Sequence, residues 1–210
     1  WSREDGFCLG QKAVDEKSNE ITAIPELLDK IQIKGQIVTI DAMGTQKSIA
    51  EKIRRRRADY VLALKGNQGG LYGDVELYFS DGKVREEIRA KKNYACTVEK
   101  AHGQTEKREY YQTEDIKWLW QKKDWKGIKS IGMEEKTIRD EKRERKEYRY
   151  YISSLETDIE TFRRAVRGHW SIESMHWHLD VTFREDANTT LDKQAAQHQN
   201  IIRKWRLSIL

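Results

Sequence analysis

The stretch Arg167–Asp186 holds charged and aromatic residues at spacings that could support chemistry. In a helix with about 3.6 residues per turn, four polar side chains share one face at i, i+4, i+7 and i+11: His169, Glu173, His176 and Asp180. Trp170 and Trp177 flank this face. The spacing leaves two interpretations open, a functional site or a structural helix whose Glu and His side chains pair with each other.

A second carboxylate, Asp41, falls where it could work together with Glu173. The β-branched runs Gln36–Asp41 and Tyr60–Lys65 predict two buried strands, joined by a helix that ends near Arg57. Such a unit must be parallel, and parallel sheets bind ligands beyond the carboxyl ends of their strands. Asp41 and Lys65 fall at these ends.

Paired carboxylates have three plausible uses: acid and base catalysis on sugars, a metal site, or a buried ionic cluster. The basic α/β composition favours the metal site. Asp and Glu oxygens suit Mg²⁺, and two such ions about 3.5–4 Å apart can bracket a phosphodiester during in-line displacement. The pair therefore predicts phosphoryl transfer on DNA or RNA.

A rival metal interpretation uses the i, i+3 pair of Glu173 and His176, a spacing found in di-iron helix bundles. The same pattern recurs at Glu99 and His102, but there it falls in a predicted strand and turn, where bundle geometry fails. His176 and His178 point to opposite sides of a helix, which argues against a shared zinc ion.

Composition narrows the class of protein. With 210 residues, 36% charged and 10% aromatic, the chain can build one sizeable core with an elaboration and is not of disordered type. The net charge of +5 suits a polyanion, although 35 acidic residues offset the 40 basic ones. Cys8 and Cys96 lack metal-ligand spacing, which indicates a reduced, cytoplasmic protein. No apolar run approaches the roughly 18 residues of a membrane span.

The pattern along the chain predicts three parts: the first part of an α/β core (1–80), an antiparallel β-rich insertion (81–153), and a helical part of the core that carries Glu173 (154–210). A further strand is expected over Phe7–Val14, after a turn. The charge run Arg139–Arg149 predicts a solvated hairpin tip, with a DNA contact as the alternative.

Four segments of the sequence resemble the conserved blocks of bacterial insertion-sequence transposases of the DDE type, in the group that includes the H-repeat-associated proteins. They are KSNEI (17–21), TIDAMGTQ (39–46), DYVLALKGNQ (59–68) and RGHWSIESMHWHLDVTFRED (167–186). The blocks occur in the family's order and span nearly the whole chain, and the last is specific.

The resemblance implies an RNase H-like catalytic core interrupted by a β-rich insertion. It matches Asp41 to the family's second catalytic aspartate and Glu173 to its catalytic glutamate, both holding Mg²⁺ or Mn²⁺, with two ions in the complete protein. The implied activity is DNA strand transfer, with transposon ends and target DNA as partners. A homodimer is expected by analogy with related transposases.

The chain departs from related transposases around Glu173. Their flanking tyrosine, arginine and lysine, which grip DNA, are replaced here by Val166, His169 and Asp180. The DNA-contact candidates therefore lie at two places, just beyond the second strand and just before Glu173: Lys65, Asn67, Arg167, His169 and Trp170.

The family's first catalytic aspartate lies on the first strand of its core, and this sequence opens at Trp1, in what the pattern indicates is the middle of a hairpin. Asp5 falls in a turn and cannot replace that aspartate. We therefore expect an N-terminally truncated transposase that is inactive or nearly so by itself. The alternative is a catalytically inactive remnant that at most binds DNA electrostatically.

Overall fold

A computed structural model describes residues 1–12, 20–101, 103–141, 143–187 and 189–209. The chain forms two compact units: one comprises Ile33–Val166, and the other comprises Trp1–Gln32 together with Arg167–Leu210. The larger unit is a mixed α/β structure built on one six-stranded sheet, as the sequence predicted at the level of fold class.

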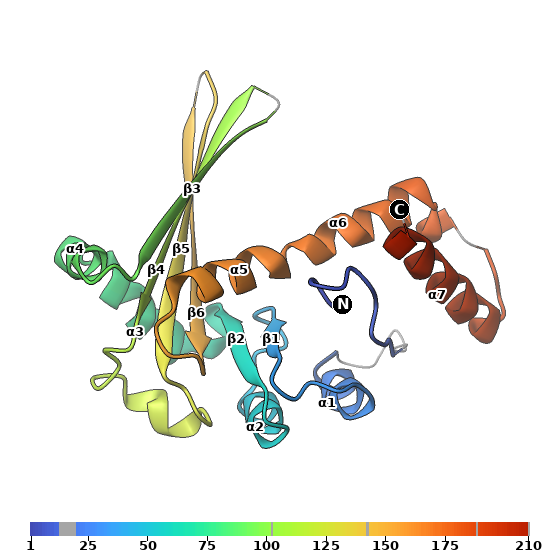
Figure 1. The fold of residues 1–210 in the computed structure, drawn as a ribbon, viewed down its shortest axis with the longest axis horizontal. Helices are drawn as coiled ribbons and strands as arrows, with labels where there is room; N and C mark the ends of the chain where they lie inside the picture. Colours follow the sequence, from blue (N-terminus) through green and yellow to red (C-terminus); the bar gives the residue numbers. More distant parts are fainter. Residues whose placement is uncertain (13–19, 102, 142, 188, 210) are drawn as a thin grey trace. The chain divides into compact units, whose positions relative to one another are not determined.

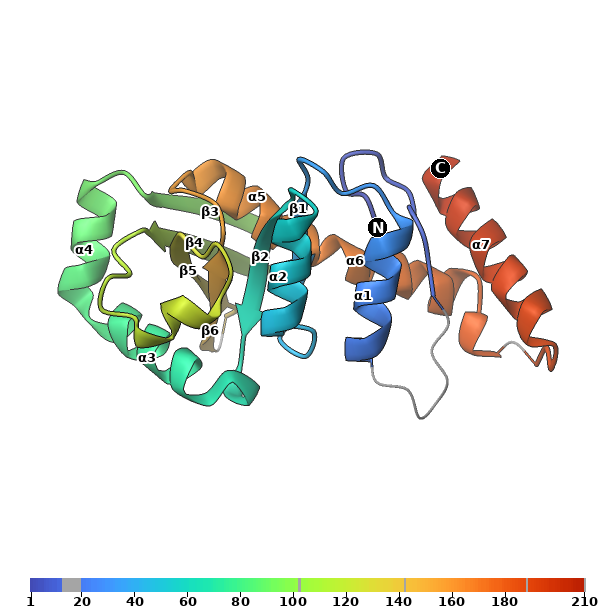
Figure 2. The same cartoon turned by 90° about the horizontal axis from the view of Figure 1, so that it is seen from below.

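The sheet begins with the predicted parallel pair. β1 (Ile37–Ile40) lies beside β2 (Asp59–Leu64) in parallel register, and the connection carries α2 (Lys47–Arg55). Figure 2 shows α2 alongside these strands, and its buried residues Ile49, Ala50 and Ile53 explain why this basic helix stays in place. The amphipathic spacing of these apolar residues fixes the side that the helix buries.

The four strands of the predicted β-rich segment continue the same sheet, in the order β1-β2-β6-β5-β4-β3. β2 pairs antiparallel with β6, and each later pair is antiparallel as well. The strands are β3 (Tyr94–Ala101), β4 (Gln104–Thr113), β5 (Ser130–Arg139) and β6 (Glu144–Ser153). Their far ends project as two hairpins in Figure 1.

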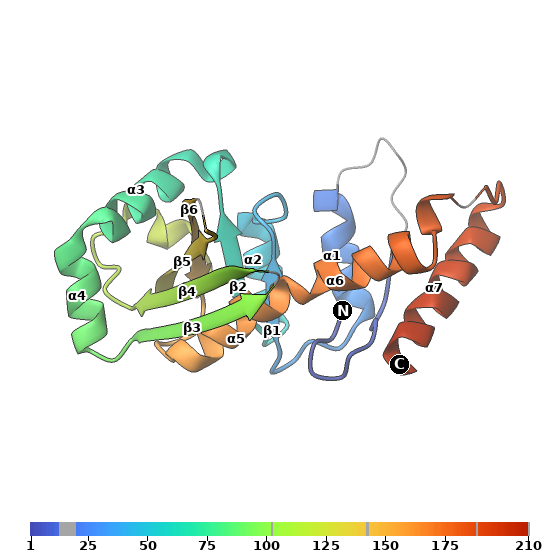
Figure 3. The ribbon, with the colours of Figure 1, turned by 90° about the horizontal axis from the view of Figure 1, so that it is seen from above.

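Helices cover both faces of the antiparallel part of this sheet. Tyr151 packs edge-on against Phe162 of α5 (Ile159–His169), with ring centroids 5.7 Å apart. Its neighbour Tyr150 points to the opposite face and meets Tyr72 of α3 (Gly69–Ser80) at 5.6 Å. Because successive strand residues alternate between faces, α5 and α3 must lie on opposite sides, as Figure 3 shows.

One helix of this unit was not predicted. The sequence from Asp81 onward was expected to be strand-like, but Gly82–Ala90 forms α4. The Asp81 carboxylate accepts a hydrogen bond from the backbone N–H of Lys83 at 2.8 Å and so caps the helix. Ile88 is its one buried residue, and most of its other residues are charged or polar.

The smaller unit is helical: it holds α1 (Glu20–Lys30), α6 (Ser171–Trp177) and α7 (Lys193–Ile209). The strand expected over Phe7–Val14 is absent from residues 7–12, where the structure has one isolated bridge between Ser2 and Phe7; Ala13 and Val14 lie outside the described residues. Among the described residues, no helix combines the length and apolarity needed to cross a bilayer.

The Arg167–Asp186 stretch is not one regular helix. α5 ends at His169, α6 begins at Ser171, and a π-helical turn occupies His178–Thr182. A π turn holds more residues than an α turn, so the regular spacing that was expected to carry Asp180 on the polar face does not continue through this turn. Met175 and Leu179 are buried, so the stretch makes apolar contacts, whereas Trp177 is 55% exposed.

Candidate functional site

Asp41 lies where the sequence placed it, directly after β1 in the turn that leads to α2. Its side chain is exposed, and its Oδ1 accepts a hydrogen bond from the backbone N–H of Gly44 at 3.0 Å. This bond to the backbone three positions ahead restricts the rotamer of the carboxylate. The turn thus presents a carboxylate to solvent at the carboxyl end of a parallel strand.

Thr45 ties this turn to the sheet. Its side chain is almost completely buried, and its hydroxyl lies 2.9 Å from the carbonyl oxygen of Asp41 and 2.7 Å from that of Ala63 in β2. One hydroxyl proton is shared between two acceptors on adjacent strands. The backbone of Asp41 is therefore held against β2.

The segment after β2 reaches back to the same turn. Asn67 donates its side-chain amide to the Ala42 carbonyl at 2.7 Å, and Gln68 donates to the Ala42 and Thr45 carbonyls at 3.0 and 2.9 Å. The backbone N–H of Lys65 donates to Oε1 of Gln68 at 3.1 Å. We call Asp41–Thr45, together with Lys65–Gln68, the Asp41 turn assembly.

The two predicted DNA contacts at this end of the sheet differ in how much of each side chain is left to bind DNA. Lys65 is exposed on the short connection after β2. Asn67 is also exposed, but one of its amide hydrogens is committed to Ala42. Both assignments stay predictions.

The sequence assigned no role to Thr45 or Gln68, although they lie within the blocks TIDAMGTQ and DYVLALKGNQ. Their roles depend on hydrogen bonds to backbone carbonyls, and such bonds leave no pattern of spacing in the sequence.

The predicted residues before Glu173 lie at the junction of α5 and α6. Arg167, His169 and Trp170 are each half-buried, and the rings of His169 and Trp170 meet edge-on at 5.3 Å. Glu173 belongs to α6, but its side chain lies outside the described part of the structure. Asp41 and Glu173 fall in different compact units, so their pairing stays a prediction.

The alternative metal interpretations receive no support. Glu99 lies on β3, not on a helix, and His102 is outside the described residues. Within the described part of the chain, no group of three or more His, Cys, Asp or Glu side chains is arranged to hold a metal ion. The side chain of Glu173 is not among these described groups.

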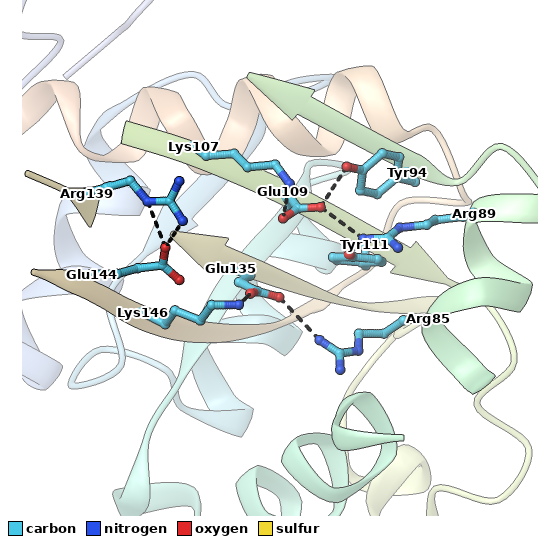
Figure 4. A network of polar contacts seen from close by, with 10 residues as sticks. All are labelled: Arg85, Arg89, Tyr94, Lys107, Glu109, Tyr111, Glu135, Arg139, Glu144 and Lys146. Carbon is cyan, nitrogen blue, oxygen red and sulfur yellow. Dashed lines mark hydrogen bonds and ion pairs between the residues drawn. The ribbon is translucent and has the colours of Figure 1, made fainter. Parts of the chain in front are cut away.

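A separate polar cluster lies on the face of the sheet that α4 covers, and Figure 4 shows it. Glu109 and Glu135 stand directly opposite each other on β4 and β5, and both side chains are buried. Two carboxylates in this position repel each other unless cations compensate. The cations that pair with them come from α4 and from the strands: Arg85, Arg89, Lys107 and Lys146.

This cluster is electrostatically satisfied. Burial raises the pKa of Glu109, but hydrogen bonds from Lys107 and Tyr94 and the charges of Lys107 and Arg89 outweigh it and hold the pKa below its ordinary value. The adjoining hollow of about 350 Å³ is bordered by Lys107, Arg139 and Lys146, each paired with a carboxylate. Its charges stabilise the strands, so we assign the cluster a structural role.

Comparison with known proteins places this chain in a class. The sequence model of the family described as "Transposase DDE domain" matches residues 2–208. The chain therefore belongs to the DDE transposase family, as the four sequence blocks indicated.

Relatives of known sequence carry matching names. "Putative transposase YncI" of Escherichia coli O157:H7 is 41% identical over 220 residues, which cover 100% of this chain and 54% of that protein. "H repeat-associated putative transposase YhhI" of E. coli K12 is 40% identical over 219 residues, covering 100% of this chain and 56% of that protein. The chain thus spans about half the length of these relatives.

Proposed function

We propose that the complete protein transposes DNA by metal-dependent phosphoryl transfer: it cleaves the ends of a mobile element and joins the 3′-hydroxyl to target DNA. The family match over residues 2–208 carries this proposal. The position of Asp41 supports it, because an exposed carboxylate in a fixed turn beyond a parallel strand is where such sheets bind ligands. A homodimer is proposed by analogy with related transposases.

The chemistry of Asp41 fits a divalent cation. Its carboxylate supplies hard oxygen atoms, and its exposure lets a hydrated ion approach. We propose Glu173 as a second ligand on the basis of the family block, with Mg²⁺ or Mn²⁺ as the ions and two of them in the complete protein. Bound ions of this kind stabilise the charge on the attacking and leaving oxygens of a phosphodiester.

The remaining residues are proposed to hold DNA. The exposed ammonium of Lys65 can pair with a backbone phosphate close to Asp41. Asn67 has one amide hydrogen left for such a contact after it donates to Ala42. Arg167, His169 and Trp170 are proposed to contact DNA near Glu173.

The test is cleavage of the element's own ends by the complete protein with Mg²⁺ or Mn²⁺. Asp41→Asn and Glu173→Gln should each lower the cleavage rate by more than about 100-fold, because loss of a ligand exceeds the 10–100-fold effect typical of residues that only support ligands. The exposed carboxylates Asp115 and Glu86 provide matched controls, and Asp115→Asn and Glu86→Gln should cleave at the unaltered rate. Undiminished cleavage by Asp41→Asn or Glu173→Gln would refute the site.

The second candidate function is DNA binding without catalysis, which the net charge of +5 favours. Binding of this kind weakens steeply as salt rises, because cations on the protein displace counterions from phosphates. A complete protein that binds element ends with this salt dependence, but never cuts them with either metal, would establish this function in place of the first.

A further inference from the structure

The side chain of Gln68 makes more contacts to the Asp41 turn than any other described side chain outside it. Its Oε1 accepts from the N–H of Lys65, and its Nε2 donates to two carbonyls, those of Ala42 and Thr45. This pattern fixes the orientation of the amide. A backbone N–H can only donate and a carbonyl can only accept, so a flipped amide would lose all three bonds.

The two carbonyls belong to residues that determine the position of the Asp41 carboxylate. Ala42 directly follows Asp41, and Thr45 directly follows Gly44, whose N–H binds Oδ1 of Asp41 at 3.0 Å. Gln68 therefore holds the turn on both sides of that N–H. Thr45 anchors the same turn from beneath through its hydroxyl.

We propose that Gln68 is a positioning residue for Asp41, acting through the Ala42–Thr45 backbone and without contact to metal or DNA. The proposal rests on the proposed function, in which Asp41 is a metal ligand. Side chains that orient a ligand contribute about 10–100-fold to metal affinity in proteins. Gln68 supplies this support from the segment after β2. Residues that follow both parallel strands therefore help to fix the position of the Asp41 carboxylate.

The chemistry of the contact requires an amide. A carboxylate at position 68 would place negative oxygen atoms against the two carbonyls and would lose both donated bonds. An alanine would remove the amide and leave both carbonyls without this donor. Gln68→Glu therefore removes the contact with almost no change of volume, and Gln68→Ala provides a second variant in case the first fails to fold.

The experiment uses this 210-residue chain and two measurements that do not need activity. Amide hydrogen exchange reports on the N–H of Gly44, and electron paramagnetic resonance measures the affinity for Mn²⁺. We expect Gln68→Glu and Gln68→Ala to accelerate exchange at Gly44 by about tenfold or more and to weaken Mn²⁺ binding within the 10–100-fold range. The melting temperature of Gln68→Ala should stay close to that of the unaltered chain.

Gln46 offers a matched control: it lies between β1 and α2, directly after the Asp41 turn, and among the described residues its Nε2 donates to one carbonyl, that of Met43, at 3.4 Å. Gln46→Glu should leave both measurements within twofold of the unaltered chain. Unaltered Gly44 exchange in both Gln68 variants would overturn the proposal.

Asp41→Asn separates the two hypotheses. If Asp41→Asn abolishes Mn²⁺ binding and the Gln68 variants bind Mn²⁺ normally, the positioning role fails while the metal site stands. If Asp41→Asn binds Mn²⁺ as tightly as the unaltered chain, the metal site itself fails, and with it the proposal for Gln68.

Discussion

The two ends of the six-stranded sheet are stabilised by different kinds of interaction. At the apolar end, a buried cluster joins the sheet to α5, with residues from β2, β3, β4, β6 and α5: Val61, Ala95, Tyr110, Tyr151, Phe162 and Val166. At the charged end, formed by residues 96–109 and 134–149, buried carboxylates pair with cations instead. Packing tolerates almost no change of shape, whereas ion pairs respond to pH and salt.

The contrast between packing and ion pairs also concerns the support of the Asp41 turn assembly. The Asp41 turn assembly is attached to the apolar end, through the bond from Thr45 to Ala63 of β2. A carboxylate that must hold a metal in a fixed geometry benefits from a support that does not vary with conditions. The charged end can vary more without disturbing Asp41.

The largest effect on stability should come from a substitution at Gly132 of β5. A Cβ added there would lie 2.7 Å from Cε2 of Phe162 and still nearer its Cζ, and the ring is fully buried. We expect Gly132→Ala to lower the free energy of unfolding by about 3 kcal/mol, at the upper end of overpacking costs. Denaturant unfolding measures this change.

Two variants check that the cause is the ring. Gly82→Ala serves as the control, because nothing lies within 4 Å of a Cβ there, and it should change stability by less than about 0.5 kcal/mol. Adding Phe162→Leu to Gly132→Ala should cost less than the sum of the two single changes. Strict additivity would show that Gly132 and Phe162 do not conflict.

The sequence predicted the strands at both ends of the sheet, but not the ion pairs of the charged end. β-branched runs located β1 and β2, and the antiparallel strands lie within the predicted β-rich segment. Asp158 caps α5 by accepting from the N–H groups of Glu160 and Thr161. α4 was missed because most of its residues are charged, and Val84 and Ile88 alone form its apolar i, i+4 pair. The cross-strand carboxylates Glu109 and Glu135 depend on strand register, which sequence alone does not fix.

The candidate site shows the same division. Asp41 could be predicted because its place depends on a strand and the turn after it. Gln68 could not, since its role depends on which carbonyls its amide meets after folding. The regular polar face around Glu173 was also expected, but the π turn at His178–Thr182 interrupts it, and such turns have no simple sequence pattern.

A moderate loss of stability should appear at the charged end as pH falls. Glu109 is ionised and paired in the folded chain, with a pKa held below its ordinary value, so its contribution is complete above the unfolded pKa of about 4.3. That contribution is lost as pH decreases through the lowered folded pKa. We expect Glu109→Gln to cost about 2 kcal/mol at pH 7 and markedly less at pH 3.

Urea unfolding of the unaltered chain and of Glu109→Gln at both pH values gives the difference directly. Gly132→Ala serves as the comparison, because packing conflict does not titrate and its cost should be the same at both pH values. If the cost of Glu109→Gln is equal at pH 7 and pH 3, the ion pairs do not stabilise this end.

The smallest effect on stability should come from the exposed ion pair between Arg139 at the end of β5 and Glu144 at the start of β6. Arg139 is 71% exposed, so solvent screens the pair, and Arg139→Ala should cost less than about 0.5 kcal/mol. Arg108 is the matched comparison: its side chain is 8% exposed and pairs with Glu106 and Glu134, so Arg108→Ala should cost several times more.

Because Arg139 is already neutralised by Glu144, its loss should also change DNA affinity by less than twofold at moderate salt, measured by fluorescence anisotropy. A tenfold loss of affinity would instead identify this hairpin as a DNA contact, the alternative that its charge run left open.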